Sequence, residues 1–151
     1  MLRARLTEAL KDAMKARDQR RVSALRLILA KLKDQDIAAR SAESREGIDD
    51  ERILQMLQSM VKQRRESIEL FLKGGRLDLV QQEEGEIAVI ESFLPKQLGE
   101  SDIAAAAKAM IGELGATSVK DMGKVMAALK GRFAGQMDFT KAAAVVKQLL
   151  A

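Results

Sequence analysis

Apolar residues recur along almost the whole chain at the three- and four-residue spacing of an α-helix, and no long alternating run predicts a β-strand. The first apolar stripe begins at Leu2. A second stripe runs from Val22 to Leu32, and Leu27 lies on another side of the same predicted helix. This second apolar side favours a central position for that helix. A polar stretch rich in Ser and Glu then predicts a loop over residues 38–50.

Residues with the chemistry of helix caps mark the expected ends of the N-terminal helices. Asp18 is the expected N-cap of the second helix, and Asp49 or Asp50 is the expected N-cap of the third. The two glycines at 74–75 are expected to end the third helix, and a fourth helix is predicted over about 77–94. A chain that folds back at these glycines would pair the third and fourth helices as an antiparallel hairpin.

The helical pattern breaks at Pro95 and Gly99, and three shorter helices with smaller apolar residues follow. Their expected boundaries are an N-cap at Ser101, a stop at Gly115, a capping box from Ser118 to Asp121, a stop at Gly131 and a start at Asp138 or Thr140. The sequence therefore predicts an all-α protein. We expect an N-terminal four-helix bundle-like domain over residues 1–95 and a C-terminal three-helix domain over residues 96–151.

The residue types that are missing narrow the possible chemistry. The 151 residues include no Cys and no His, so the sequence excludes thiolate nucleophiles, imidazole bases, Ser-His-Asp triads and metal sites built on Cys or His. Acidic residues between Asp78 and Glu91 could in principle serve acid–base chemistry or hold Mg²⁺, but a solvated helix face is the favoured interpretation. We therefore expect no catalytic residue, no metal site and no cofactor.

No segment is apolar enough to predict a membrane span, and no signal peptide is visible. Residues 2–17 are amphipathic and rich in Arg, which is faintly similar to a mitochondrial presequence. Glu8 and Asp12 interrupt that stretch, and its apolar stripe has an obvious use in the fold. The expectation from the sequence is a soluble, cytoplasmic chain that does not bind membranes.

Charges are concentrated in the predicted third helix at Arg64 and Arg65. If the third and fourth helices form a hairpin, Arg65 faces Glu84, and Arg64 lies near Gly85 and Glu86. The favoured interpretation is a structural ion pair between Arg65 and Glu84 that fixes the register of the hairpin. The alternative is an exposed pair of arginines that binds phosphate.

The sixth predicted helix carries a possible binding face. Basic residues exceed acidic ones by ten to three over residues 1–33 and by eight to five over residues 96–151, which fits an anionic partner or an ordinary solvated surface. In the sixth helix, Gly123, Ala127 and Lys130 follow one line, with Lys120 and Lys124 opposite the apolar residues. The glycine could admit a neighbouring helix, or the stripe could receive an RNA phosphate backbone. The cations of the RNA-binding alternative are Lys120, Lys124, Lys130 and Arg132.

Five segments along the chain carry a resemblance to a known family: residues 25–30, 62–69, 84–87, 93–98 and 120–126. In this order they are similar to the YqeY family of small bacterial proteins and their mitochondrial relatives, and the similarity covers nearly the whole chain. The tail alone also resembles the C-terminal domain of the GatB subunit of the tRNA-dependent amidotransferase. Gly123, Val125 and Met126 match the Gly-x-Val-Met pattern of that domain, and residues 130–132 match the basic turn that follows.

The resemblance implies a helical N-terminal domain with a three-helix tail. It also implies an association with carbon–nitrogen ligases that use glutamine as amido donor. In the amidotransferase the corresponding tail contacts tRNA, and the catalytic centres lie elsewhere in the complex. This sequence has no amidase-type Ser/Lys motif and no zinc or Mg²⁺ cradle, so the resemblance extends to RNA binding and not to catalysis.

Two functional hypotheses follow from the sequence. The leading hypothesis is a non-catalytic accessory module that binds tRNA or another structured RNA through Lys120, Gly123, Lys124, Lys130 and Arg132. The alternative is a protein-interaction module that docks an amidotransferase complex or another partner. An enzyme ranks third, because the composition offers few catalytic groups.

Overall fold

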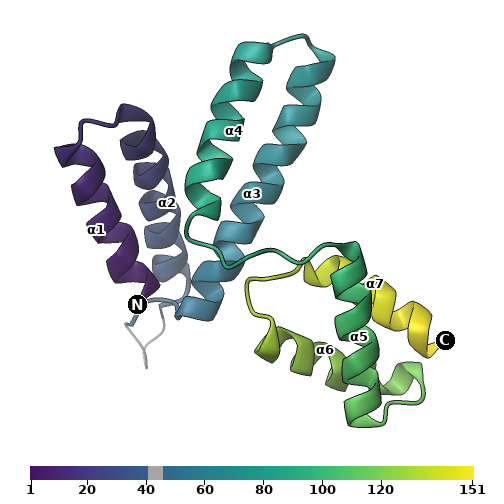
Figure 1. Cartoon of the computed structure of the whole chain (residues 1–151). Helices are drawn as coiled ribbons and strands as arrows, with labels where there is room; N and C mark the ends of the chain where they lie inside the picture. Colours follow the sequence, from purple (N-terminus) through teal and green to yellow (C-terminus); the bar gives the residue numbers. More distant parts are fainter. Residues whose placement is uncertain (41–45) are drawn as a thin grey trace. The chain divides into compact units, whose positions relative to one another are not determined.

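The computed structural model describes residues 1–40 and 46–151, and all regular structure in this part of the chain is helical, as predicted. Part of the loop expected over residues 38–50 therefore lies outside the described residues. The chain forms two compact units (Figure 1): Met1–Leu94, called the N-terminal unit below, and Pro95–Ala151, called the tail unit.

The N-terminal unit is built from two helical hairpins. Its helices are α1 (Leu2–Lys15), α2 (Gln19–Ala38), α3 (Asp50–Lys73) and α4 (Leu77–Glu91). Helix α1 packs against α2, α3 packs against α4, and α2 and α4 bring the two hairpins together (Figure 1). The apolar stripes meet in one core, in which the side chains of Leu6, Leu25, Ile28 and Leu57 are fully buried. Burial of these stripes is the main force that assembles the four helices.

Most caps of the N-terminal unit lie where the sequence places them. Asp18 accepts a hydrogen bond from the Arg21 backbone N–H at 3.2 Å, and Asp49 accepts one from the Arg52 N–H at 3.0 Å. Of the two candidates for the third cap, Asp49 is therefore the N-cap. Two details differ from expectation. Helix α4 ends at Glu91, and Leu27 is largely exposed, so the second apolar side of α2 is not packed within this unit.

The tail unit contains three α-helices in the described chain: α5 (Glu100–Leu114), α6 (Met122–Arg132) and α7 (Phe139–Leu150). A short 3-10 helix, η1 (Val119–Asp121), leads directly into α6. Each α-helix packs against the other two around a core of smaller side chains. The fully buried members of this core include Ala107, Val125, Leu129, Ala142 and Val146.

Three predicted boundaries in the tail need correction. Helix α5 begins at Glu100 after Gly99, not after Ser101, because the chain is already helical one residue earlier. The side chain of Ser118 makes no cap hydrogen bond; instead the Asp121 carboxylate accepts one from the Thr117 N–H at 3.0 Å. Gly131 lies inside α6, which ends at Arg132.

Two other tail signals are confirmed by the backbone. Gly115 adopts the left-handed conformation (φ 62°) that ends α5. Asp138 is the N-cap of α7 and accepts hydrogen bonds from the backbone N–H groups of Thr140 and Lys141 at 2.9 and 3.4 Å.

The residues that enter the tail unit are fastened to the loop before α7. The side-chain amide of Gln97 donates a hydrogen bond to the Gly135 carbonyl at 2.6 Å. The backbone N–H of Leu98 donates one to the Gln136 carbonyl at 2.7 Å. Residues ahead of α5 are thus part of the packed tail.

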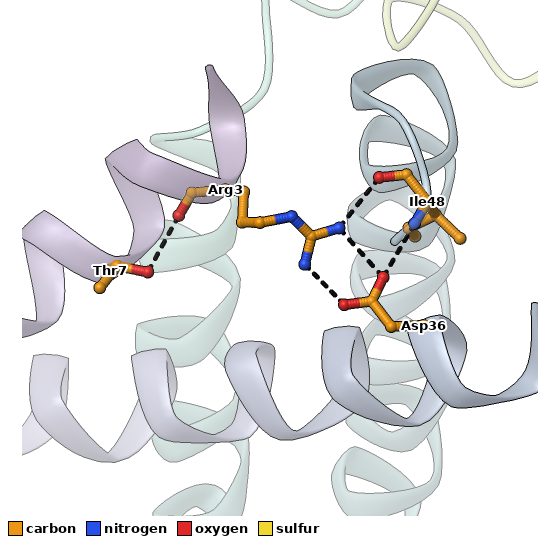
Figure 2. Close-up of polar contacts among 4 residues, drawn as sticks. All are labelled: Arg3, Thr7, Asp36 and Ile48. Atoms are coloured by element: carbon orange, nitrogen blue, oxygen red, sulfur yellow. Dashed lines mark hydrogen bonds and ion pairs between the residues drawn. The ribbon is translucent and has the colours of Figure 1, made fainter. Parts of the chain in front are cut away.

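A partly buried ion pair joins three segments of the N-terminal unit that are distant in sequence. Arg3 of α1 grips Asp36 of α2 through two hydrogen bonds of 2.6 and 3.0 Å, and it also donates to the Ile48 carbonyl at 3.0 Å (Figure 2). The Ile48 N–H donates back to Asp36 at 2.9 Å. We call these contacts of Arg3, Asp36 and Ile48 the Arg3–Asp36 clasp. A Cβ atom at Gly47 would collide with the charged ends of Arg3 and Asp36, so a larger residue there would have to displace these side chains from the clasp.

The Arg3–Asp36 clasp should make the free energy of unfolding depend on pH. The hydrogen bond from Arg3, helped by the Ile48 N–H, lowers the pKa of Asp36 below its ordinary value. The ionised carboxylate therefore stabilises the fold above its unfolded pKa, and this contribution is lost as the pH falls through the folded pKa. Asp36→Asn should lower the free energy of unfolding by about 1–2 kcal/mol at pH 7. The difference from wild type should shrink below about pH 4.

Chemical denaturation at several pH values measures this difference. The control is Asp34→Asn, which removes the same charge at an exposed position of α2. Equal effects of the two substitutions at every pH would contradict a specific role for the clasp.

Candidate nucleic-acid interface

One side of η1 and α6 carries most of the residues that the sequence selects for RNA binding. Lys120, Gly123, Lys124, Ala127 and Lys130 are all exposed, while Val125 and Leu129 on the other side of α6 are fully buried in the tail core. Helical spacing brings the exposed residues together, because positions three and four apart share one face. We call these five exposed residues the lysine–glycine face.

Gly123 is not placed there by packing. A Cβ atom built on this residue would meet no atom within 4 Å among those counted, which exclude its immediate neighbours and the backbone of its own helix. The alternative that Gly123 admits a neighbouring helix is therefore wrong for the tail unit. Glycine in a helix costs up to about 1 kcal/mol relative to alanine, and no packing contact offsets that cost here. The bare backbone at Gly123 is instead open to whatever approaches α6 from outside.

The lysines of this face are not neutralised by ion pairs. Among the described residues, no carboxylate lies within 4.0 Å of the ammonium groups of Lys120, Lys124 and Lys130. The hydrogen bond from the Thr117 N–H lowers the pKa of Asp121, and the charge of nearby Lys124 adds to this effect. The face therefore presents three positive charges around an exposed glycine.

Arg132 is placed differently from the other predicted RNA-binding residues. Its guanidinium pairs with Glu113 of α5 at 3.1 Å, and this hydrogen bond raises the pKa of Arg132. Position 132 lies on α6 well away from the line of Gly123, Ala127 and Lys130. Arg132 thus links α6 to α5 at the surface and does not belong to the lysine–glycine face.

The ion pairs of the α3–α4 hairpin involve other partners than expected. Arg65 pairs with Glu91 at 2.8 Å, whereas Glu84 is exposed and makes no ion pair in the described chain, so the predicted Arg65–Glu84 pair is wrong. Arg64 pairs with Glu86 at 2.9 Å, as its expected neighbourhood suggests, and lies 3.9 Å from Glu83.

The physical reason for this correction is the stripe of α4. Its inward positions step from Val80 to Glu83 and then to Ile87, so Glu83 is the half-buried residue and Glu84 faces solvent. Burial raises the pKa of Glu83, and the neighbouring Glu86 adds to the effect. The exposed-arginine alternative also fails for Arg64, whose side chain is only 15% exposed.

Neither a cluster of metal-ligating side chains nor a helix able to cross a membrane is present in the part of the chain that the structure describes. Within these residues, no three His, Cys, Asp or Glu side chains come together as a possible metal site. No described helix is both long and apolar enough to cross a membrane.

Sequence comparison identifies the family. The family model described as "Yqey-like protein" matches residues 3–150, which is nearly the whole chain. The chain therefore belongs to the YqeY family.

Curated fungal proteins are similar to this chain over part of its length. "Altered inheritance of mitochondria protein 41, mitochondrial" of Eremothecium gossypii is 38% identical over 117 residues, which cover 76% of this chain and 61% of that protein. The protein of the same name from Lachancea thermotolerans is 36% identical over 60% of this chain and 46% of its own length. An uncharacterised Schizosaccharomyces pombe protein is 33% identical over 63% of this chain and 73% of its own length. The chain thus spans only 61% of the Eremothecium gossypii protein and 46% of the Lachancea thermotolerans protein.

These names correct the expected cytoplasmic location. Relatives that are 36–38% identical are named as mitochondrial proteins, which contradicts that expectation. The expectation depended on the lack of a visible targeting signal, and such a lack does not specify a compartment. In the structure, α1 buries Leu2, Leu6 and Ala13 in the core, so its amphipathic pattern is explained by packing.

The two ion pairs of the α3–α4 hairpin should differ in their effect on stability. Arg64→Ala leaves Glu86 and Glu83 half-buried without their partner and should lower the free energy of unfolding by about 1–3 kcal/mol. Arg65→Ala removes a pair in which the arginine is 63% exposed and should cost at most about 0.5 kcal/mol. Urea denaturation of both variants makes the comparison, and equal losses would show that burial does not distinguish the two pairs.

Proposed function

We propose that this chain is a non-catalytic accessory module that binds the phosphate backbone of tRNA or another structured RNA through the lysine–glycine face. The observation that carries the proposal is the open space over Gly123, with three lysines around it that pair with no carboxylate of the described residues. A glycine that serves no packing contact and costs helix stability is well explained by close approach of another backbone. The lysines would neutralise phosphates on either side of that approach.

The composition also supports a phosphate-reading mode. The chain has four Phe and no Trp or Tyr, so it lacks the aromatic platforms that stack single-stranded bases. Double-helical RNA is recognised mainly by its shape, its phosphates and its 2′-hydroxyl groups. The resemblance of the tail to the tRNA-contacting domain of the amidotransferase subunit favours tRNA as the first partner to test.

We further propose that the four-helix and three-helix units are separate domains with separate tasks, with the principal RNA contact in the tail. No residue is assigned a catalytic role and no cofactor is proposed. The names of the fungal relatives make the mitochondrion the compartment in which an RNA partner would be sought first.

The salt dependence of tRNA binding tests the charge of the lysine–glycine face. Lys124→Glu combined with Lys130→Glu should weaken binding about tenfold or more at low salt and reduce the slope of log K against log salt by about 1–2. The matched control is Lys108→Glu with Lys147→Glu, which makes the same charge change at exposed positions of α5 and α7. Filter binding or fluorescence anisotropy provides the measurement.

Two outcomes would count against the proposal. The first is a wild-type chain that does not bind tRNA at low salt. The second is an equal loss of affinity for the lysine–glycine face variant and for Lys108→Glu with Lys147→Glu. That result would show that binding depends on the net charge of the chain and not on this face.

A second prediction separates stability from binding at Gly123. Gly123→Ala adds a Cβ into open space, so it should raise the free energy of unfolding by up to about 1 kcal/mol through helix propensity. The same methyl group should hold an approaching RNA backbone away and weaken tRNA binding severalfold. Gly112→Ala is the control, because Gly112 lies in α5 of the same unit with equally open space over it. Thermal unfolding and tRNA titration of both variants give the comparison, and a Gly123→Ala chain that binds normally would argue against close approach.

The second candidate function is a protein-interaction module that docks an amidotransferase complex or another partner. One observation favours it: Leu70, Leu72 and Leu77 are all more than half exposed around the turn of the α3–α4 hairpin. Exposed apolar side chains that gather in one place often mark a protein contact. A pulldown that resists nuclease and high salt, and that fails with Leu72→Ser and Leu77→Ser, would favour this candidate over RNA binding.

A further inference from the structure

Two arginines of the N-terminal unit share a single aromatic ring. The guanidinium carbon of Arg5 in α1 lies 5.7 Å from the centroid of the Phe93 ring, and that of Arg21 in α2 lies 5.8 Å from it. Phe93 follows α4 and is only 6% exposed, so the ring is covered and the arginines lie at the surface above it. The ring attracts each cation but carries no net charge that could neutralise them.

The other arginines that the structure shows in close polar contacts behave differently. Each of five arginines is held by a carboxylate, namely Arg3, Arg64, Arg65, Arg76 and Arg132. No carboxylate of the described chain lies within 4.0 Å of the guanidinium groups of Arg5 and Arg21. These two cations are thus oriented by the face of an aromatic ring, and no carboxylate of the described residues occupies their N–H groups.

The surroundings of this pair add positive charge. Arg17 is exposed in the turn between α1 and α2, and Arg20 is exposed in the first turn of α2, so both lie within four residues of Arg21 in the sequence. Arg17 has a φ of 55°, a left-handed conformation that glycine adopts more easily than arginine. Residues 1–33 carry ten basic and three acidic side chains, so the charge of the α1–α2 hairpin is strongly positive.

We propose that Arg5 and Arg21, held on Phe93, form a second phosphate-binding surface, which contacts the same structured RNA as the lysine–glycine face. This inference rests on the proposed function and deepens it by adding the N-terminal unit to the RNA contact. The chemical basis is that a phosphate oxyanion accepts hydrogen bonds from guanidinium N–H groups that no carboxylate occupies. The buried ring excludes base stacking, so this surface reads phosphates and not sequence.

The packing of α1 favours RNA over a membrane as the source of phosphate. Helices that lie on membranes insert an apolar face between the lipids. In α1 the apolar residues Leu2, Leu6 and Ala13 are buried in the protein core, and the one exposed large apolar side chain of the helix, Met14, does not by itself make a face for insertion. RNA requires no such insertion.

Two surfaces on one chain also have a quantitative consequence for binding. When one unit has bound, the second unit is held near the same RNA, so the second contact forms at a high effective concentration. Loss of either surface should therefore weaken binding by the full chain markedly, and the salt dependence should report the phosphate contacts of both.

The experiment measures tRNA binding by the full chain across a salt series. Arg5→Gln with Arg21→Gln should weaken binding at low salt by about fivefold or more and reduce the slope of log K against log salt by about 1–2. The matched control, Lys62→Gln with Lys73→Gln, removes two exposed charges from α3 of the same unit and should change affinity less than about twofold. Arg5→Lys with Arg21→Lys keeps the charges and should retain most of the slope, while circular dichroism and thermal unfolding verify the fold of each variant.

The possible results separate this inference from the proposed function. If wild type binds tRNA and the glutamine variant behaves like the Lys62/Lys73 control, the second surface is refuted and the lysine–glycine face still stands. If wild type binds no tRNA, both are refuted. If Arg5→Lys with Arg21→Lys reduces the slope of log K against log salt as much as Arg5→Gln with Arg21→Gln, the loss comes from packing on Phe93. The phosphate surface is then refuted. A last outcome would refute the phosphate surface for RNA in favour of a membrane. In it, the chain binds vesicles with about 30% anionic lipid only when Arg5 and Arg21 are present, while Arg5→Gln with Arg21→Gln leaves the salt dependence of tRNA binding unchanged.

Discussion

The Arg3–Asp36 clasp is the contact on which the arrangement of the N-terminal unit depends. It connects the start of α1, the last turns of α2 and the segment that leads into α3, three places that the apolar stripes alone would leave free to slide. Hydrophobic burial favours any arrangement that covers the stripes, whereas a two-pronged guanidinium–carboxylate contact accepts only one geometry. Once the clasp sets the course of α1 and the entry to α3, Phe93 can lie under Arg5 and Arg21, and the surface charges of the unit acquire fixed positions.

The structure uses positive charge in two distinct ways. Arg3 and Arg64 form ion pairs with carboxylates inside the N-terminal unit and stabilise its fold, and Arg132 links α6 to α5 at the surface through Glu113. Lys124, Lys130 and the two arginines on Phe93 have no such partners in the described chain, so their fields extend outward. The count of basic residues therefore says little about binding until the paired ones are set aside. Among the cations without such a partner, the lysines around Gly123 and the two arginines on Phe93 are distinguished by what surrounds them: open space over a helix backbone in one case and a buried aromatic ring in the other.

The sequence predicted what local chemistry determines. The helical period and the cap at Asp18 follow from short-range hydrogen bonding, and the structure confirms them. For two other helices the sequence left two candidates each, and the structure selects Asp49 over Asp50 and Asp138 over Thr140. Glu84 was assigned to the wrong side of its helix, because a stripe that advances by three residues cannot be told from one that advances by four without its packing partner.

Contacts between distant segments could not be predicted. Asp36 is one of many acidic residues that Arg3 could have met, and nothing near Phe93 in the sequence points to Arg5 or Arg21. The candidate face on α6 was visible in the pattern of lysines around Gly123. The reason for the glycine was not, since only the structure shows that the space over it is open.

The hydrogen bonds from Gln97 and Leu98 to the loop before α7 have a consequence for where the tail begins. A fragment cut at the first residue of α5 would keep all three helices but would strip the carbonyls of Gly135 and Gln136 of their donors. The tail unit thus begins before its first helix, and the segment ahead of α5 holds the loop before α7 in place.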